Sequence, residues 1–180
     1  IIVACNTATA MALDTLKNEF NDIPIIGVIE PGSEKAIFET NTNKIGVIGT
    51  IATISSGAYE KAIQKLNRKV KIISKACPLF VPFVEEGLIS GSAINDIAKH
   101  YLSSFYKNVD TIILGCTHYP LLKDVISQNT KNIKLIDSAL SVAKAAHNEL
   151  LVHDSLSGEQ DSGILHCYVT DLPMRFEELG

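Results

Sequence analysis

Short apolar runs alternate along this chain with longer segments in which apolar residues recur every three or four positions. The short runs are rich in Ile and Val, as expected of buried parallel strands, and the longer segments are typical of helices. The alternation predicts an α/β fold in which mostly parallel sheets are covered by helices. We expect strands at 1–4, 24–29, 44–50, 70–74, 109–114, 133–136 and 164–169. We expect helices at 8–20, 33–39, 55–66, 92–105, 121–128, 141–151 and 173–179.

The segment 77–82 breaks the alternation. It reads Cys-Pro-Leu-Phe-Val-Pro, which is apolar but contains two prolines. Proline removes a backbone donor and fixes its own φ, so this segment is predicted to be an irregular loop. A polar loop is expected at 155–163, where Ser and Gly recur.

Two cysteines occupy matching places in this pattern. Cys5 and Cys116 each follow a predicted strand and precede small polar residues that open a predicted helix. Ligands of open α/β sheets bind at the carboxyl ends of strands, and the positive end of a helix lowers the pKa of a nearby thiol. This repeated arrangement of strand, cysteine and helix predicts two related lobes, each of which places one thiol on a shared cleft.

Two thiols that face each other across a cleft favour racemase chemistry. One removes the α-proton of a substrate while the other adds a proton to the opposite face, and the roles reverse in the other direction. Asn6 and Thr7 follow the first thiol, and Thr117 and His118 follow the second. Their side chains and backbone N–H groups can hold carboxylates, which points to an acidic substrate.

Other readings of single residues stay open at this stage. Free Cys often serves as a small packing residue, and Cys77 and Cys167 fit that role because neither has the paired context. A hydrolase with Cys116 as nucleophile and His118 as base is weaker, because it leaves the other thiol unexplained.

Three further polar residues allow both a structural and a functional role. Thr50 and Thr53 end a strand and open a helix, which suits either an anion site or ordinary capping. Glu85 either reaches back into the cleft or lies in a solvated first turn.

Composition narrows the class of protein. The chain has 180 residues, 46% of them hydrophobic, and a net charge of −4. The absence of a basic run does not support binding of nucleic acid, and no apolar run reaches the length of a membrane span. The four cysteines lack zinc-type spacing and do not suggest a disulfide-stapled secreted domain, so we expect reduced thiols, no metal and a cytoplasmic location.

At these residues the chain resembles the glutamate racemases of the aspartate/glutamate racemase superfamily. The two Cys motifs are shared with the wider superfamily, whereas the segments 77–82 and 84–87 are more specific to the glutamate enzymes. The matching segments are 4–8, 27–32, 44–53, 77–82, 84–87 and 114–122.

The resemblance implies a racemase that needs no cofactor and supplies D-glutamate for peptidoglycan and cell-wall biogenesis. Cys5 would serve the D-face of the substrate and Cys116 the L-face. Glu85 and His118 would assist Cys116. The residues implied in holding glutamate are Asn6, Thr7, Thr50, Thr53, Thr117 and His118. A homodimer is compatible with this reading, and no nucleic acid or membrane is expected as a partner.

The resemblance also implies how the lobes divide the chain. Residues 29–137 would form the second lobe, and 1–28 with 138–180 would be a remnant of the first. Relatives carry an Asp-Ser-Gly segment before the first Cys motif, which assists the first thiol, and none precedes Cys5 here. We therefore expect the 180-residue chain alone to be inactive or nearly so. The alternatives are a racemase for another acidic amino acid such as aspartate, or a folded fragment that binds without catalysis.

Overall fold

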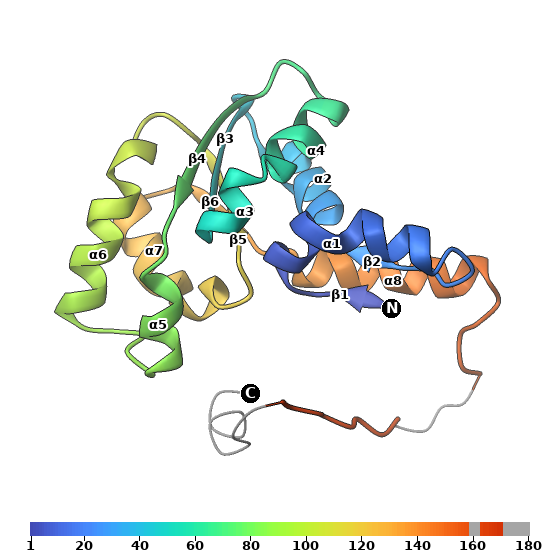
Figure 1. Ribbon diagram of the computed structural model, residues 1–180. Coiled ribbons are helices and arrows are strands. Elements are labelled where there is room, and N and C mark those ends of the chain that lie inside the picture. The colour runs from blue at the N-terminus through green and yellow to red at the C-terminus, as the bar shows by residue number, and fades with distance from the viewer. Residues whose placement is uncertain (159–162, 171–180) are drawn as a thin grey trace.

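The computed structural model describes residues 1–158 and 163–170, and it contains two parallel sheets with helices packed around them (Figure 1). The smaller sheet pairs β1 with β2, and the larger has the strand order β4-β3-β5-β6. The expected α/β fold is confirmed. The strands are β1 Ile2–Val3, β2 Ile26–Gly27, β3 Lys44–Gly49, β4 Lys71–Ala76, β5 Thr111–Gly115 and β6 Lys134–Ile136.

Helices cover both faces of the larger sheet, and other helices pack beside the smaller sheet. One core cluster gathers residues of α5, α6 and α7, and a second gathers residues of α2 and α4. Figure 1 shows α1 and α8 beside the smaller sheet. The helices are α1 Asn6–Glu19, α2 Ile29–Glu39, α3 Ile51–Ser55, α4 Ala58–Leu66, α5 Phe80–Glu85, α6 Ser92–Leu102, α7 Lys123–Thr130 and α8 Ala139–Val152, with 3₁₀ turns η1 Ser103–Phe105 and η2 Tyr119–Leu122.

The strand order reverses between β3 and β5. The chain passes from β3 to β4 on one side, and then returns to place β5 and β6 on the other. In open α/β sheets the crevice at such a reversal is where ligands bind, at the carboxyl ends of the strands. Gly49 and Gly115 are partners in register at those two ends. A Cβ on Gly115 would lie 2.7 Å from the carbonyl oxygen of Ile48, so the close approach requires glycine there.

An aromatic cluster lies in the core on one face of the larger sheet. The ring of Phe80 makes edge-to-face contacts with Tyr101 and Tyr119, with centroids 5.3 Å apart in both pairs. The Tyr119 hydroxyl donates to the carbonyl of Cys77 at 2.9 Å. These contacts hold α5 against the turn that follows β5.

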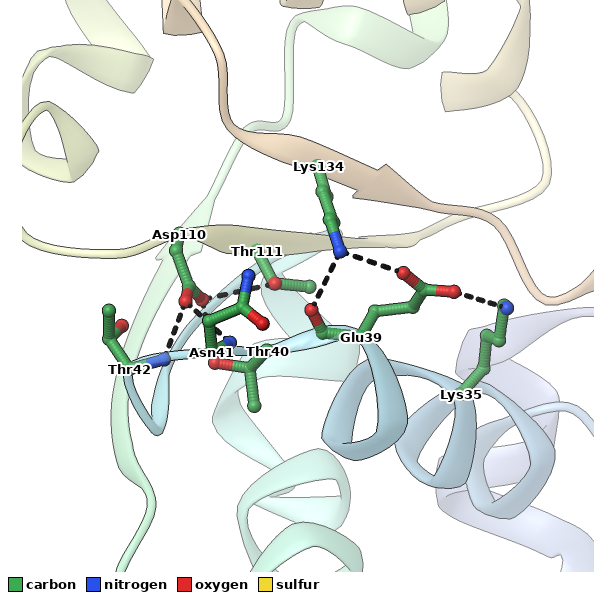
Figure 2. A network of polar contacts seen from close by, with 8 residues as sticks. All are labelled: Lys35, Glu39, Thr40, Asn41, Thr42, Asp110, Thr111 and Lys134. Carbon is green, nitrogen blue, oxygen red and sulfur yellow. Dashed lines mark hydrogen bonds and ion pairs between the residues drawn. The ribbon is translucent and has the colours of Figure 1, made fainter.

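The opposite end of β5 carries a polar network, shown in Figure 2. Asp110 accepts hydrogen bonds from the Thr40 hydroxyl at 2.6 Å and from the backbone N–H groups of Asn41 and Thr42 at 2.8 and 2.7 Å. Partial burial raises the pKa of Asp110, but these hydrogen bonds outweigh it and lower the pKa to about 2. The carboxylate therefore ties the α2–β3 connection to the start of β5.

A neighbouring ion pair extends that network to β6 (Figure 2). Lys134 donates to the Glu39 carboxylate at 2.9 Å and to the Glu39 carbonyl at 3.0 Å, and Lys35 lies 2.5 Å from the same carboxylate. Hydrogen bonds and the positive charges of the two lysines lower the pKa of Glu39 to about 2. The end of α2 is thus fixed to two strands of the larger sheet.

Several local expectations were wrong, and prolines account for two of them. Pro82 is the third residue of α5, where a loop was expected, and Pro31 is the third residue of α2, which begins before the expected 33–39. Amide groups in the first turn have no intrahelical acceptor, so proline is tolerated there.

Two further expectations need correction. The helix expected at 55–66 begins later, as α4 at Ala58, directly after Gly57, whose φ is +64°, and the short helix α3 before it was not expected. Residues 164–169 form no strand, and Ile164, Leu165 and Tyr168 are 84, 86 and 91% exposed. The helix expected at 173–179 lies outside the described residues.

The two sheets agree with an architecture of two lobes. The division into 29–137 and a remnant made of 1–28 and 138–180 stays a prediction, and residues 159–162 and 171–180 of that remnant lie outside the described part. Within the described part, no helix combines the length and the apolar character needed to cross a membrane.

Candidate active site

Cys5 occupies the junction between β1 and α1. It is the N-cap of α1, with an extended backbone, and its sulfur accepts a hydrogen bond from the N–H of Ala8 at 3.4 Å. This is the position where Ser or Thr usually caps a helix, so the thiol faces the positive end of the helix dipole. The side chain is a free, exposed thiol.

Cys116 follows β5 and is a free thiol that is only 7% exposed. Burial raises its pKa, and the charge of Cys5 raises it further. The backbone N–H groups of His118, Tyr119 and Thr117 act in the opposite direction. The expectation that a position near a helix start lowers the thiol pKa is therefore wrong for Cys116, because desolvation is the larger effect.

The two thiols belong to one region of the molecule. The charge on Cys5 affects the pKa of Cys116 although the residues come from different sheets. The other two cysteines differ from this pair. Burial raises the pKa of Cys77 to about 12, and its sulfur faces the carbonyl of Lys75 at 3.7 Å. Cys167 is exposed in a segment without regular structure.

His118 and Glu85 extend the site from Cys116. The Nδ1 of His118 lies 3.8 Å from the Cys116 sulfur and 3.5 Å from the Thr117 hydroxyl. Its Nε2 pairs with the carboxylate of Glu85 at the end of α5. The carboxylate orients the imidazole so that one ring nitrogen faces the thiol. The Glu85 side chain is 45% exposed, so it is solvated and paired with His118 at the same time.

Three threonine hydroxyls join the two lobes beside the thiols. The Thr7 hydroxyl lies 2.8 Å from that of Thr50 and 3.0 Å from that of Thr53. Thr50 also donates to the Thr53 hydroxyl at 3.0 Å, so the three oxygens form a triangle. Thr50 caps α3 by accepting from the N–H of Thr53 at 3.1 Å, which means that the capping role and the placement at the site coexist.

Asn6 has a partner that the sequence did not reveal. Its Oδ1 accepts a hydrogen bond of 2.6 Å from the hydroxyl of Tyr59, and both side chains are buried. Tyr59 lies on α4, and its spacing in the sequence resembles that of any core residue of a helix. No signal in the sequence distinguishes it, because the contact depends on the packing of α4 against α1 and β5.

The structure brings the predicted site residues together in three groups. Cys5 and Asn6 begin α1, and the three threonines meet beside them. Cys116, Thr117, His118 and Glu85 form the third group. The described residues contain no cluster of three or more His, Cys, Asp or Glu side chains arranged to hold a metal ion. The groups present are suited to proton transfer and to hydrogen bonding of an anion.

Known proteins match the chain along most of its length. The family model for Asp/Glu/hydantoin racemases matches residues 1–146. This chain belongs to that racemase family. The resemblance to glutamate racemases that the sequence suggested is confirmed by relatives in both sequence and structure.

Two relatives illustrate the similarity within this racemase family. The glutamate racemase of Aquifex aeolicus is 48% identical over 179 residues, which is 99% of this chain and 66% of the relative. The crystal structure of glutamate racemase from Francisella tularensis in complex with D-glutamate superposes with a TM-score of 0.91, at 40% identity, over 99% of this chain and 66% of that chain. The chain thus spans slightly less than two thirds of the length of these relatives.

Proposed function

We propose that the protein interconverts L- and D-glutamate without a cofactor, with Cys5 and Cys116 as the two acid/base groups. The observation that carries this proposal is the pair of free thiols that follow strands of different sheets and whose neighbouring residues, Asn6 and Gly115, both contact Tyr59. A single base can abstract a proton, but a pair on opposite faces of one carbon gives each of the two thiols a role in the reaction.

In the L-to-D direction, the Cys116 thiolate takes the α-proton of L-glutamate and leaves a carbanion at that carbon. The Cys5 thiol then gives its proton to the opposite face, which yields D-glutamate. The reaction ends with Cys116 protonated and Cys5 deprotonated, so the enzyme is set for the reverse direction. No proton is gained or lost in one passage.

The raised pKa of Cys116 means that the resting site is already protonated for one direction of the reaction, from D- to L-glutamate. At neutral pH Cys116 holds its proton and is ready to donate it to a carbanion formed from D-glutamate. In the L-to-D direction Cys116 must first lose that proton. His118 is placed to accept it, because its Nδ1 faces the sulfur and Glu85 stabilises a positive charge on the ring.

The substrate carboxylates would be held by the polar side chains around the thiols. The amide of Asn6 and the hydroxyls of Thr7, Thr50 and Thr53 supply uncharged donors on one side. Thr117 and His118 supply donors beside Cys116. The Francisella tularensis glutamate racemase, with which this chain superposes, is in complex with D-glutamate, and this supports glutamate as the substrate. Supply of D-glutamate for peptidoglycan, with its consequences for cell shape, and a cytoplasmic location are part of the same proposal.

The test is a racemisation assay on the protein encoded by the complete gene, followed by circular dichroism from each pure enantiomer. We expect both enantiomers of glutamate to reach the racemic mixture, with no cofactor added and with a chelator present. Activity on aspartate but not on glutamate would favour a racemase for another acidic amino acid. Binding of glutamate without turnover would overturn the two-thiol mechanism.

The 180-residue chain, assayed alone, provides a second arm of this experiment. Its turnover is compared with that of the protein encoded by the complete gene, since the chain spans 66% of the length of relatives such as that of Aquifex aeolicus. Activity equal to that of the complete protein would show that the described residues contain every group the reaction needs.

A further inference from the structure

Tyr59 contacts both backbone junctions that carry the thiols. Its side chain is 1% exposed, and its hydroxyl binds Asn6, the residue directly after Cys5. Its ring lies against Gly115, the residue directly before Cys116, where a Cβ would come within 3.1 Å of Cε2. Tyr59 therefore contacts a neighbour of each thiol, Asn6 after Cys5 and Gly115 before Cys116.

The hydrogen bond fixes the orientation of the Asn6 amide. A buried tyrosine hydroxyl must donate its proton, and among the described residues Asn6 is the hydrogen-bond partner found for Tyr59. If the amide were reversed, its Nδ2 would donate to the hydroxyl and the tyrosine proton would have no acceptor. The Oδ1 of Asn6 therefore faces Tyr59, and Nδ2 points away from it.

The amide nitrogen is left free by this arrangement. Among the described residues, the Ser33 hydroxyl is the fully buried side-chain polar atom that lacks a hydrogen-bond partner. The Nδ2 atom of Asn6 does not fall in that class. Among the described residues no hydrogen bond of Nδ2 occurs either, although Asn6 as a whole is only 3% exposed. The two N–H groups of Asn6 are therefore available to donate to a ligand next to Cys5.

We propose that Tyr59 is a positioning residue for the racemase reaction, which fixes the Asn6 amide with its nitrogen toward the substrate carboxylate and supports Gly115 beneath Cys116. This inference rests on the proposed function. Without the tyrosine hydroxyl, the Asn6 amide can rotate and present its oxygen to the carboxylate, which replaces an attraction with a repulsion. The ring alone maintains the support under Gly115.

The decisive variant is Tyr59→Phe in the complete protein, which removes one oxygen and keeps the ring. Loss of one oriented hydrogen bond is expected to reduce kcat/KM for glutamate about tenfold, chiefly through a higher KM. In an Asn6→Ala background the same substitution should change kcat/KM less than about twofold, because the amide that it orients is gone. A residue with a merely structural role would lower the thermal stability and would give equal effects in both backgrounds, and that result would overturn the proposal.

Tyr101→Phe is the matched control. Tyr101 is also buried, at 8% exposure, and its hydroxyl accepts a hydrogen bond from the N–H of Leu79 on the other face of the sheet. We expect its kcat/KM to stay within about twofold of the unsubstituted protein. An effect as large as that of Tyr59→Phe would show that loss of any buried hydroxyl disturbs the site, and would also overturn the proposal.

Asn6→Asp keeps the inference testable if Tyr59→Phe does not fold. Aspartate still accepts the hydrogen bond of Tyr59 but has no N–H to offer the substrate, so we expect KM for glutamate to rise by at least about tenfold. An unchanged KM would show that the amide nitrogen is not used. If the unsubstituted protein does not racemise glutamate, the proposed function fails; if it does and these variants behave like it, only the role of Tyr59 fails.

Discussion

The two ends of β5 hold ionisable side chains in opposite ways. Asp110, before the strand, is held in its charged form by four hydrogen bonds, and its pKa falls to about 2. Cys116, after the strand, is held in its neutral form, because burial raises its pKa. Asp110 keeps one protonation state over the whole physiological range, whereas Cys116 retains a proton that it can give up.

This difference indicates that one end of β5 stabilises the fold and that the other end carries a group suited to proton transfer. The amino end of β5 is tied to the α2–β3 connection, and nothing there has to change during a reaction. The carboxyl end opens on the crevice between β3 and β5, where Gly49 and Gly115 allow the two strand ends to approach closely. Substitutions at the two ends should therefore have different effects on activity and on unfolding.

The largest effect is expected from substitution of the thiols. Cys116→Ser in the complete protein should reduce racemisation about 10²–10⁴-fold, because serine does not act as a proton-transfer group near neutral pH. The free energy of unfolding should change little, since the two side chains have similar shapes. Cys5→Ser should have the same effect, because neither thiol can reach the face served by the other. Circular dichroism of each enantiomer measures the activity, and full activity in either variant would refute the two-thiol assignment.

A smaller effect is expected when the support of His118 is removed. Glu85→Gln takes away the charge that orients and stabilises the imidazole, so kcat/KM should fall about 10–100-fold. Glu149→Gln is the matched control, because Glu149 pairs with His153 at 3.1 Å at the end of α8, where no site residue lies. Equal activities of the two variants would show that the Glu85 contact has no role in the reaction.

The smallest effect on activity is expected at the other end of the strand. Asp110→Asn should lower the free energy of unfolding by about 1–2 kcal/mol, because the amide replaces a charged acceptor of four hydrogen bonds. Racemisation at a temperature well below unfolding should stay unchanged. Asp96→Asn, at an exposed position of α6, should leave both quantities unchanged. A loss of activity in Asp110→Asn at constant stability would break the separation between the two ends.

The same substitution predicts a dependence on pH. The folded-state pKa of Asp110 is about 2, below its ordinary value of 3.8, so its charged form stabilises the fold at pH values above about 4. That contribution is lost as the pH falls from about 4 to about 2. Urea unfolding of the unsubstituted protein and of Asp110→Asn should therefore differ at pH 7 and converge near pH 2. A difference that persists at pH 2 would assign the stabilisation to another cause.

Much of the fold could be predicted from the sequence because the central strands of the larger sheet, β3 and β5, are almost wholly buried. Its strands are short apolar runs, and the run at 44–50 matches β3 Lys44–Gly49 almost residue for residue. The run at 164–169 looks similar but forms no strand. An apolar run becomes a strand only when a neighbour supplies hydrogen bonds, and the pattern of a single segment does not contain that information.

In the candidate site too, local features could be predicted from the sequence, whereas contacts between distant segments could not. Residues next to the thiols could be named from the sequence because a strand end and a helix start are local features. The place of Glu85 on His118 and of Tyr59 on Asn6 depends on how α5 and α4 pack, and the pKa of Cys116 depends on burial. These contacts connect residues that are distant in the chain, so local periodicity could not predict them.

The strand order also sets an order of assembly. β3 and β4 are separated only by α3 and α4, whereas β5 must find β3 after a much longer stretch of chain. Loop closure becomes entropically more costly with length, by about 0.6 kcal/mol for each doubling, so the β3–β4 unit is expected to form before β5 docks. Gly49 and Gly115 then meet only when β5 arrives. A partly folded chain would hold most of its helices but no crevice, and the ability to turn over substrate would be among the last properties to appear during refolding.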